Sequence, residues 1–420
     1  MTAGVGPVGY DPLDPLTHQN PYPTYRRLRD EDPVHRTARG YWVLSRFEDV
    51  FRAASDGTTF SSARGLTFED DEILALGLKP TLVMMDRPMH TTFRRLISRG
   101  FTPRKVSELE AAVREFVRGR VAVLTEAGGV GEVDAVEALA GPLPTYVVAH
   151  YLGVPESDRH QFGVWSDAIV QANATGSTVR DATGAVTGLY GYFSELVAWR
   201  RGHPGDDMLS DLVSARVDGR PLAEDEILGY CFVMIAGGND TASGLLGGSL
   251  AALTEYRDQR QLLLDDPGLL AGAVEELLRF TAPVQGLSRT TTCGVDVGGR
   301  SIPGGSKVHL LYGSANRDRR EFGTTAEDVD VTRRIGRHLT FGNGPHHCIG
   351  AAVARLQARV ALDELLSAAP EFEVDASRGR LAPGPFVRRF ESLPFVAGAA
   401  GRVGRRAHVP GHGVRAGDGR

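Results

Sequence analysis

The stretch Phe341-Gly-Asn-Gly-Pro-His-His-Cys-Ile-Gly350 carries the strongest structural signal in this 420-residue sequence. Two glycines and a proline force a tight, irregular path just ahead of Cys348, because glycine tolerates unusual backbone angles and proline fixes its own. The residues from Ile349 onward follow the pattern of a helix. We therefore expect Cys348 at a helix N-terminus, where free N–H groups and the helix dipole stabilise a thiolate.

A thiolate in this setting is a nucleophile or a metal ligand, and four interpretations compete. A lone buried cysteine would leave the surrounding glycines without a purpose. A zinc site at His346, His347 and Cys348 is disfavoured, because consecutive residues rarely converge and no second pair of ligands stands nearby. A dinucleotide-binding loop is disfavoured, because Gly342-x-Gly344 lacks a third glycine and a suitably spaced acidic residue. The fourth interpretation makes Cys348 the axial ligand of a haem iron, with glycines letting the loop pass close under a flat macrocycle.

The stretch 341–350 resembles the signature of a known family. Its pattern Phe-Gly-x-Gly-x-His-x-Cys-x-Gly matches, without a departure, that of the haem-thiolate monooxygenases, the cytochrome P450 family. In that family the thiolate pushes electron density toward the iron and favours cleavage of the O–O bond. The resemblance covers roughly residues 18–396. It implies haem b as the cofactor, Cys348 as the iron ligand, and Phe341 and Gly350 as further cofactor-binding residues.

Glu276 and Arg279 lie three residues apart in a predicted helix over 268–280, so they share a face and can form an ion pair. Such pairs are common on solvated surfaces, where they contribute little to stability. The family resemblance implies instead a buried pair that holds the cysteine loop in place, with Arg333 as a third member. We therefore expect these three residues to have a structural role.

His90 and Arg94 lie four residues apart on one face of a predicted helix. Two cations in that arrangement are mildly unfavourable unless they meet an anion. Haem has two propionate groups, and the family resemblance implies that His90, Arg94, Arg289 and His346 contact them. Taken singly, each of the four is equally compatible with an ordinary surface cation.

The stretch Ala236-Gly-Gly-Asn-Asp-Thr-Ala242 interrupts a long predicted helix over 224–254. Two adjacent glycines in a helix interior cost about 1 kcal/mol each relative to alanine, so they need a reason. One is close approach of a cofactor plane to Gly237, and another is bending by a bond from the Thr241 hydroxyl to the Gly237 carbonyl. The family pattern implies that Asp240 and Thr241 are catalytic, delivering the protons that cleave the O–O bond.

The composition is that of an ordinary globular protein, 42% hydrophobic and 24% charged. A formal net charge of −5 gives no basic footprint for nucleic acid. Three cysteines exclude a disulfide framework and a four-cysteine zinc site. The N-terminus has no signal-peptide pattern, and no apolar run approaches the ~18 residues of a membrane span. We therefore expect a cytoplasmic protein without a membrane contact.

The helical periodicity predicts a mainly α fold: one large helical domain with small β-sheets. We expect an N-terminal extension over 1–17, a cytochrome P450-like domain over 18–400 and a disordered Gly/Arg-rich tail over 401–420. Besides the helices above, the patterns predict helices over 104–126, 135–152, 187–201 and 349–369, and strands or hairpins over 34–36, 41–45 and 284–312.

The family resemblance implies a monooxygenase that hydroxylates or epoxidises a hydrophobic small molecule with O2 and two electrons. The chain length leaves no room for a fused flavin or iron–sulfur domain, so we expect separate electron donors, and the resemblance implies a ferredoxin and a ferredoxin reductase. We also expect a monomeric enzyme. Arg355 and Arg359, near the cysteine, are candidates for the docking patch, and a solvated helix face is an equally good interpretation of them. The residues expected to line the substrate pocket are mostly apolar: Leu74, Leu76, Leu78, Leu82, Met234, Gly238, Val284, Leu287 and Leu393.

Two other functions stay open at this point. A peroxygenase would use hydrogen peroxide on the same haem, but relatives of that kind depart from the acid–threonine pair that Asp240 and Thr241 preserve. A haem-based gas-binding or sensor protein would not need that pair, and a sensor usually carries an output domain.

Overall fold

The structure, a computed structural model, describes residues 8–68, 80–175 and 183–398. The expected tail over 401–420 lies outside these residues, as do Leu74, Leu76 and Leu78. Helices dominate the described chain, which confirms the mainly α prediction. The α-helices are α1 (Pro15–Gln19), α2 (Tyr22–Glu31), α3 (Phe47–Ser55), α5 (Met89–Ser98), α6 (Pro103–Glu108), α7 (Glu110–Val130), α8 (Pro142–Tyr151), α9 (Arg159–Thr175), α10 (Thr183–Gly202), α11 (Met208–Ser214), α12 (Glu224–Glu255), α13 (Arg257–Asp265), α14 (Leu270–Thr281), α15 (Tyr312–Ala315), α16 (Arg319–Phe322) and α17 (Ala351–Ala368).

The expected helix over 135–152 is interrupted. A π-helical turn over Val136–Ala140 precedes α8, which begins at Pro142. Proline has no N–H, so Pro142 cannot donate to the carbonyl of Ala138 one turn earlier. The guanidinium of Arg120 on α7 donates to that carbonyl instead. The change of helix type thus follows from a missing backbone donor.

A five-stranded sheet has the order β1-β2-β10-β7-β3. Its strand β10 runs parallel to β2 and antiparallel to β7, so Val308 lies between Trp42 and Arg289. The sheet strands are β1 (Val34–Arg36), β2 (Trp42–Leu44), β3 (Phe60–Ser61), β7 (Leu287–Thr291) and β10 (Lys307–Leu310). The smaller sheets are made by β4 (Val133–Asp134), β5 (Arg216–Val217), β6 (Arg220–Pro221), β8 (Val295–Val297), β9 (Arg300–Ile302), β11 (Glu373–Val374), β12 (Arg380–Leu381), β13 (Phe390–Ser392) and β14 (Pro394–Val396).

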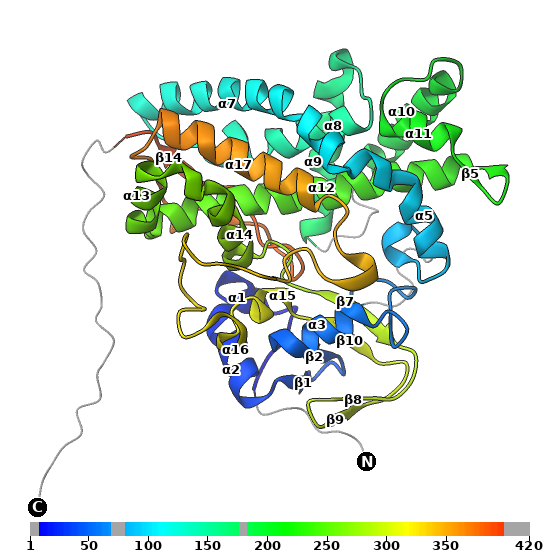
Figure 1. Cartoon of the computed structure of the whole chain (residues 1–420), viewed down its shortest axis with the longest axis vertical. Helices are drawn as coiled ribbons and strands as arrows, with labels where there is room; N and C mark the ends of the chain where they lie inside the picture. Colours follow the sequence, from blue (N-terminus) through cyan, green and yellow to red (C-terminus); the bar gives the residue numbers. More distant parts are fainter. Residues whose placement is uncertain (1–7, 69–79, 176–182, 399–420) are drawn as a thin grey trace, which may run out of the picture.

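The helices and the sheet form two parts with separate apolar cores. In Figure 1, α7 and α17 run next to each other above α12, and β1, β2, β7 and β10 lie on the other side of the molecule. The larger core fills the helical part, and a second one packs α3 against β1, β2 and β10. The loop that precedes α17 therefore lies where the two parts meet. No helix in the described ranges is long and apolar enough to cross a membrane.

Candidate active site

The glycines of the loop 341–350 adopt the conformations that the sequence predicts. Gly342 and Gly344 have φ angles of +64° and +69°, in the left-handed region that favours glycine. A Cβ atom added to Gly344 would lie 2.7 Å from the carbonyl oxygen of Ala54 at the end of α3. Asn343 Nδ2 also donates to Ser55 Oγ at 2.6 Å. At Gly344, therefore, the close approach is to the backbone of α3 rather than to a macrocycle.

Cys348 lies just before α17, whose N-cap is Gly350. Its backbone N–H donates to the Phe341 carbonyl at 2.9 Å, and its sulfur accepts the Gly350 N–H. The side chain is exposed, yet the surrounding protein raises the pKa of the thiol by burial, against the opposing effects of the Gly350 N–H, Arg94 and Arg355. The Gly350 N–H at the start of α17 thus favours the thiolate, and burial opposes it. A metal ion bound to the sulfur would remove the proton.

Glu276 and Arg279 form a fully buried ion pair on α14, with both side chains 0% exposed. Arg279 Nε and Nη2 each donate to one carboxylate oxygen at 2.7 Å, a forked geometry that only arginine provides. Arg333 joins them, with Nε 3.2 Å from Glu276 Oε1. Arg279 also donates to the carbonyls of Asn316, Ala326 and Asp328. The pair thus fixes the irregular chain between α15 and the cysteine loop.

Asn316 connects this ion pair to the cysteine loop. Its carbonyl accepts from Arg279 Nη1 at 2.8 Å, while its side chain accepts from the Leu339 N–H at 2.7 Å and donates to Thr340 Oγ1 at 2.9 Å. Thr340 in turn donates to the Leu278 carbonyl on α14. The chain of contacts therefore runs from the buried pair to the residue that precedes Phe341.

Four basic side chains from three segments meet on one side of the cysteine loop. His90 and Arg94 come from α5, Arg289 from β7 and His346 from the loop itself. The rings of His90 and His346 lie 4.2 Å apart, and Arg94 Nη2 donates to the His347 carbonyl at 2.6 Å. Burial, together with the nearby Arg289, His90 and Arg94, lowers the pKa of His346 to about 3. This cluster is therefore built to receive an anion.

The two adjacent glycines of α12 have different surroundings. Gly237 is exposed in the middle of the helix, and an added Cβ would meet nothing within 4 Å. An added Cβ at Gly238 would lie 2.9 Å from Val148 Cγ2 on α8. Gly237 thus opens the helix surface, whereas Gly238 serves close packing of two helices. Thr241 Oγ1 donates to the Gly237 carbonyl at 2.8 Å, as expected from the sequence.

Asp240 is buried next to this opening and forms an ion pair with Arg389. The two side chains are 6% and 5% exposed. Burial raises the pKa of Asp240 to about 6; Arg389 opposes this increase and Glu391 adds to it. A carboxyl group with a pKa near neutrality is suited to give and take protons.

Comparisons with known proteins agree with this geometry. The family model described as cytochrome P450 matches residues 198–382. Cytochrome P450 130 of Mycobacterium tuberculosis is 52% identical over 389 residues, which cover 90% of this chain and 95% of that protein. This chain is a cytochrome P450. The monooxygenase PikC of Streptomyces venezuelae is 37% identical over 92% of this chain and 93% of its own length. A Mycobacterium marinum cytochrome P450 solved with pseudoionone superposes with a TM-score of 0.85, 32% identity and coverage of 94% of this chain and all of that one.

Cytochromes P450 are haem b monooxygenases in which a cysteine thiolate binds the iron. Three features of the structure fit that cofactor. The sulfur of Cys348 is accessible, the surface of α12 is open at Gly237, and His90 Nε2 is buried without a hydrogen-bond partner among the described residues. Arg94 and Arg289 carry the positive charge that two propionates require, and His90 and His346, whose pKa values burial lowers, offer neutral ring N–H donors. Within the described ranges, no group of three or more His, Cys, Asp or Glu side chains is arranged to hold a metal ion.

The residues predicted to line the substrate pocket differ in how deeply their side chains are buried. Met234, Val284 and Leu287 are partly buried, and Val284 forms a backbone bridge with Val387. Leu82 is nearly buried, whereas Leu393 is 0% exposed and packs in the main core. In this structure the Leu393 side chain thus borders no accessible space.

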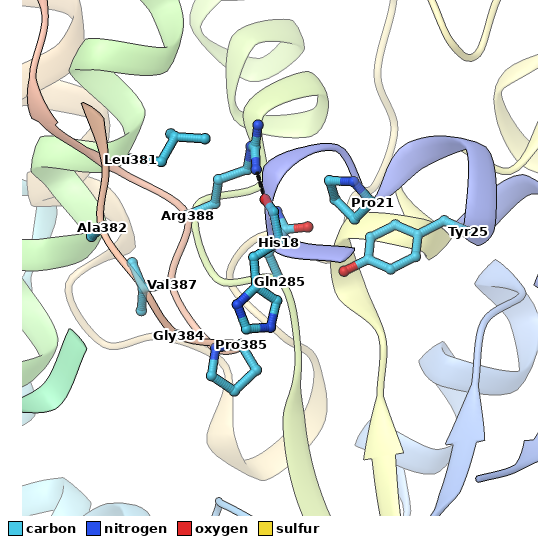
Figure 2. A pocket seen from close by; sticks show the side chains of 10 residues that line it. All are labelled: His18, Pro21, Tyr25, Gln285, Leu381, Ala382, Gly384, Pro385, Val387 and Arg388. Carbon is cyan, nitrogen blue, oxygen red and sulfur yellow. Dashed lines mark hydrogen bonds between the residues drawn. The ribbon is translucent and has the colours of Figure 1, made fainter. Parts of the chain in front are cut away.

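A small surface pocket lies elsewhere, between the N-terminal helices and the segment that joins β12 to β13. Figure 2 shows its lining, with the Arg388 guanidinium donating to the His18 carbonyl. None of the predicted site residues lines it. The lining residues are His18, Pro21, Tyr25, Gln285, Leu381, Ala382, Gly384, Pro385, Val387 and Arg388.

Sequence reasoning did not find two buried polar residues of the site, Asn316 and Arg389. Asn316 sits in an irregular segment after α15, and Arg389 in the chain that enters β13. Each acts on a residue far away in the sequence, so neither produces a periodic or local signal. Because Arg388 stands directly before Arg389, the sequence also does not indicate which of the two arginines belongs to the site.

Proposed function

We propose that this cytochrome P450 hydroxylates or epoxidises a large apolar molecule with O2 and two electrons from a separate ferredoxin and its reductase. The observation that carries this proposal is the arrangement of α12, where an open Gly237 stands next to the Thr241 hydroxyl and the buried Asp240 carboxyl. A peroxygenase or a gas sensor has no use for a buried acid at this place.

The residues around the cysteine loop would hold the cofactor. We assign Cys348 to the iron and His90, Arg94, Arg289 and His346 to the propionates. When bound, haem supplies the iron that activates O2. Phe341 and Gly350 support the loop around Cys348: the Phe341 carbonyl accepts the Cys348 N–H, and the Gly350 N–H points at the sulfur.

Thr241 and Asp240 would provide the protons. Because the Thr241 hydroxyl donates its hydrogen to the Gly237 carbonyl, its oxygen stays free to accept a hydrogen bond from a water molecule. That contact orients a proton donor above the open helix surface. Asp240, with a pKa of about 6, then transfers a proton to that water molecule. A positioned acid–base relay of this kind contributes roughly 10²–10⁴-fold to a rate.

The substrate class follows from the pocket wall and from the relatives. Met234, Val284 and Leu287 give the wall an apolar character. A vitamin D(3) 25-hydroxylase of Pseudonocardia autotrophica is 35% identical, and a Bacillus megaterium cytochrome P450 was solved with testosterone. These names support a steroid-sized or terpenoid substrate for this chain.

The arginines that we assign to docking of the electron donor differ from those that the sequence suggests. Arg355 pairs with Glu275 at 2.6 Å and Arg359 with Glu110 at 2.6 Å, so both charges are offset. The exposed arginines of α5 and the residues flanking it have no ion pair among the described residues, and α5 is the helix that contacts the cysteine loop through Arg94. We assign the docking of an acidic ferredoxin to Arg87, Arg95 and Arg99.

The test is a comparison of Thr241→Ala with Ser249→Ala in a reconstituted system. Ser249 is a matched control, because it lies on α12 and its hydroxyl makes the same bond to a carbonyl four residues back. The substrate is the compound with the largest binding-difference spectrum in a library of steroids, terpenoids and macrolides. Thr241→Ala should keep binding that compound and consuming NAD(P)H, while peroxide rises and product per electron pair falls severalfold. Equal coupling in Thr241→Ala and the parent would refute the assignment, and product formation driven equally well by added peroxide would favour a peroxygenase.

A further inference from the structure

The ion-pair partner of Asp240 is an arginine from the C-terminal part of the chain. Asp240 lies in the middle of α12, and Arg389 directly precedes β13. Their side chains form a buried ion pair. A buried ion pair costs desolvation of both groups and is weak evidence for stability by itself. The contact therefore calls for a functional explanation.

The position of Arg389 is fixed by its neighbours. The Arg388 N–H donates to the Pro283 carbonyl at 2.7 Å, and the Arg389 carbonyl accepts from the Ala382 N–H at 2.9 Å. Gly244, one turn after Asp240 on α12, lets this segment come close. A Cβ atom added there would lie 2.7 Å from the Arg388 carbonyl oxygen and 3.3 Å from Arg389 Cβ. The absence of a side chain at Gly244 thus brings Arg389 within reach of Asp240.

Arg389 is the cation that offsets the negative charge around Asp240. Among the described residues, the negative charge of Glu391 on β13 acts on Asp240. The positive charge of Arg389 also lowers the pKa of Asp167 on α9. Glu391 already has Arg380 as its own partner at 2.9 Å. Arg389 Nη2 is buried without a hydrogen-bond partner in the described part of the chain. The pair is therefore incompletely satisfied, unlike a purely structural one.

We propose that Arg389 is a positioning residue for proton delivery, which holds the Asp240 carboxylate in place and stabilises it after its proton has left. This inference rests on the proposed function, in which Asp240 and Thr241 supply protons. The proton passes from the Asp240 carboxyl to a water oxygen hydrogen-bonded at Thr241, and the carboxylate regains a proton from solvent. During that interval the Arg389 guanidinium offsets the negative charge.

The first experiment needs no turnover. In the haem-loaded enzyme, the infrared carbonyl band of the protonated Asp240 is identified as the band that Asp240→Asn removes, and it is titrated with pH. Arg389→Met should move this titration upward by about 1–3 pH units, because an adjacent opposite charge lowers a carboxyl pKa by that amount. Arg389→Lys, which keeps the charge, should restore most of the parent titration.

Two further variants make the result specific. Arg378→Met removes a surface arginine that pairs with Glu132 at 2.6 Å, and it should leave the titration unchanged. Gly244→Ala keeps the Arg389 side chain but displaces its backbone, so it should shift the titration in the same direction as Arg389→Met. If both Arg389→Met and Gly244→Ala titrate like the parent, the proposal is overturned; if Arg389→Met does not fold, Gly244→Ala alone decides.

A second readout separates this inference from the proposed function. With a ferredoxin, its reductase and NAD(P)H, the peroxide released per NAD(P)H consumed is measured against pH without any substrate. In Arg389→Met the pH dependence of peroxide release should move by the same amount as the infrared titration. An infrared shift without this change would remove Arg389 from the reaction. The expected loss of coupling in Thr241→Ala together with an unchanged Arg389→Met titration would overturn only the inference about Arg389.

Discussion

Among the described residues, the buried acid–arginine pairs Glu276–Arg279 and Asp240–Arg389 differ in how completely their hydrogen-bonding groups are satisfied. In the Glu276–Arg279 pair, every guanidinium nitrogen of Arg279 donates to the carboxylate or to a backbone carbonyl. In the Asp240–Arg389 pair, Arg389 Nη2 has no partner among the described residues, and burial raises the pKa of Asp240 to about 6. A fully bonded pair rigidifies the fold, whereas an incompletely bonded one keeps a proton exchangeable.

The largest expected effect comes from breaking the satisfied pair. Glu276→Ala leaves Arg279 buried without its counter-charge, which typically costs 3–5 kcal/mol. Because Arg279 also anchors the chain that leads to the cysteine loop through Asn316, we expect poorly folded protein with little haem. Denaturant unfolding and haem content measure this loss. Normal stability and full haem loading in Glu276→Ala would show that the Glu276–Arg279 pair does not stabilise the fold.

The next effect concerns pH and the unsatisfied pair. The pKa of Asp240 is raised in the folded state from 3.8 to about 6, so its contribution to stability is fully present below pH 3.8 and is lost as the pH rises through about 6. A shift of this size corresponds to on the order of 3 kcal/mol. We expect Asp240→Asn to remove this pH dependence of the free energy of unfolding. If the free energy of unfolding of Asp240→Asn still changed with pH as in the parent between about pH 4 and pH 6, other groups would cause the dependence.

A smaller effect is expected at Asn316, which connects the Glu276–Arg279 pair to the cysteine loop. Asn316→Ala removes the side chain that accepts from Leu339 and donates to Thr340, and it leaves a buried N–H without a partner. Such a loss costs about 1–3 kcal/mol. We expect a lower free energy of unfolding and faster haem loss, with the Asp240 titration unaltered. Haem loss at the parent rate would mean that the loop is held by other contacts.

The parts of the fold that follow from local pattern could be predicted. The long helix α12, the helix α17 and the left-handed glycines of the cysteine loop all follow from periodicity and from residue types within a few positions. The hairpin between β8 and β9 lies within the expected range 284–312 and turns at Gly298 and Gly299, with φ angles of +54° and +79°. The mainly α architecture and the family were thus accessible from the sequence.

The contacts between distant segments could not be predicted. Gly344 approaches α3, Gly238 approaches α8 and Gly244 approaches the chain before β13, but the sequence shows only that each is a glycine. The ion pair of Arg389 with Asp240 joins residues that no local pattern connects. The surroundings of the Cys348 thiol illustrate the same limit, since Arg94 acts on it from a distant part of the sequence.

The central claim is that Cys348 binds the haem iron, since both pairs derive their roles from that site. The most direct measurement is the absorption spectrum of the reduced, CO-treated protein, for the parent and for Cys348→Ser. Cys293→Ser serves as the control, because Cys293 is an exposed cysteine far from the loop in sequence. We expect the red-shifted Soret band of thiolate ligation in the parent and in Cys293→Ser, and its loss in Cys348→Ser. A Cys348→Ser protein that keeps this band would contradict the account.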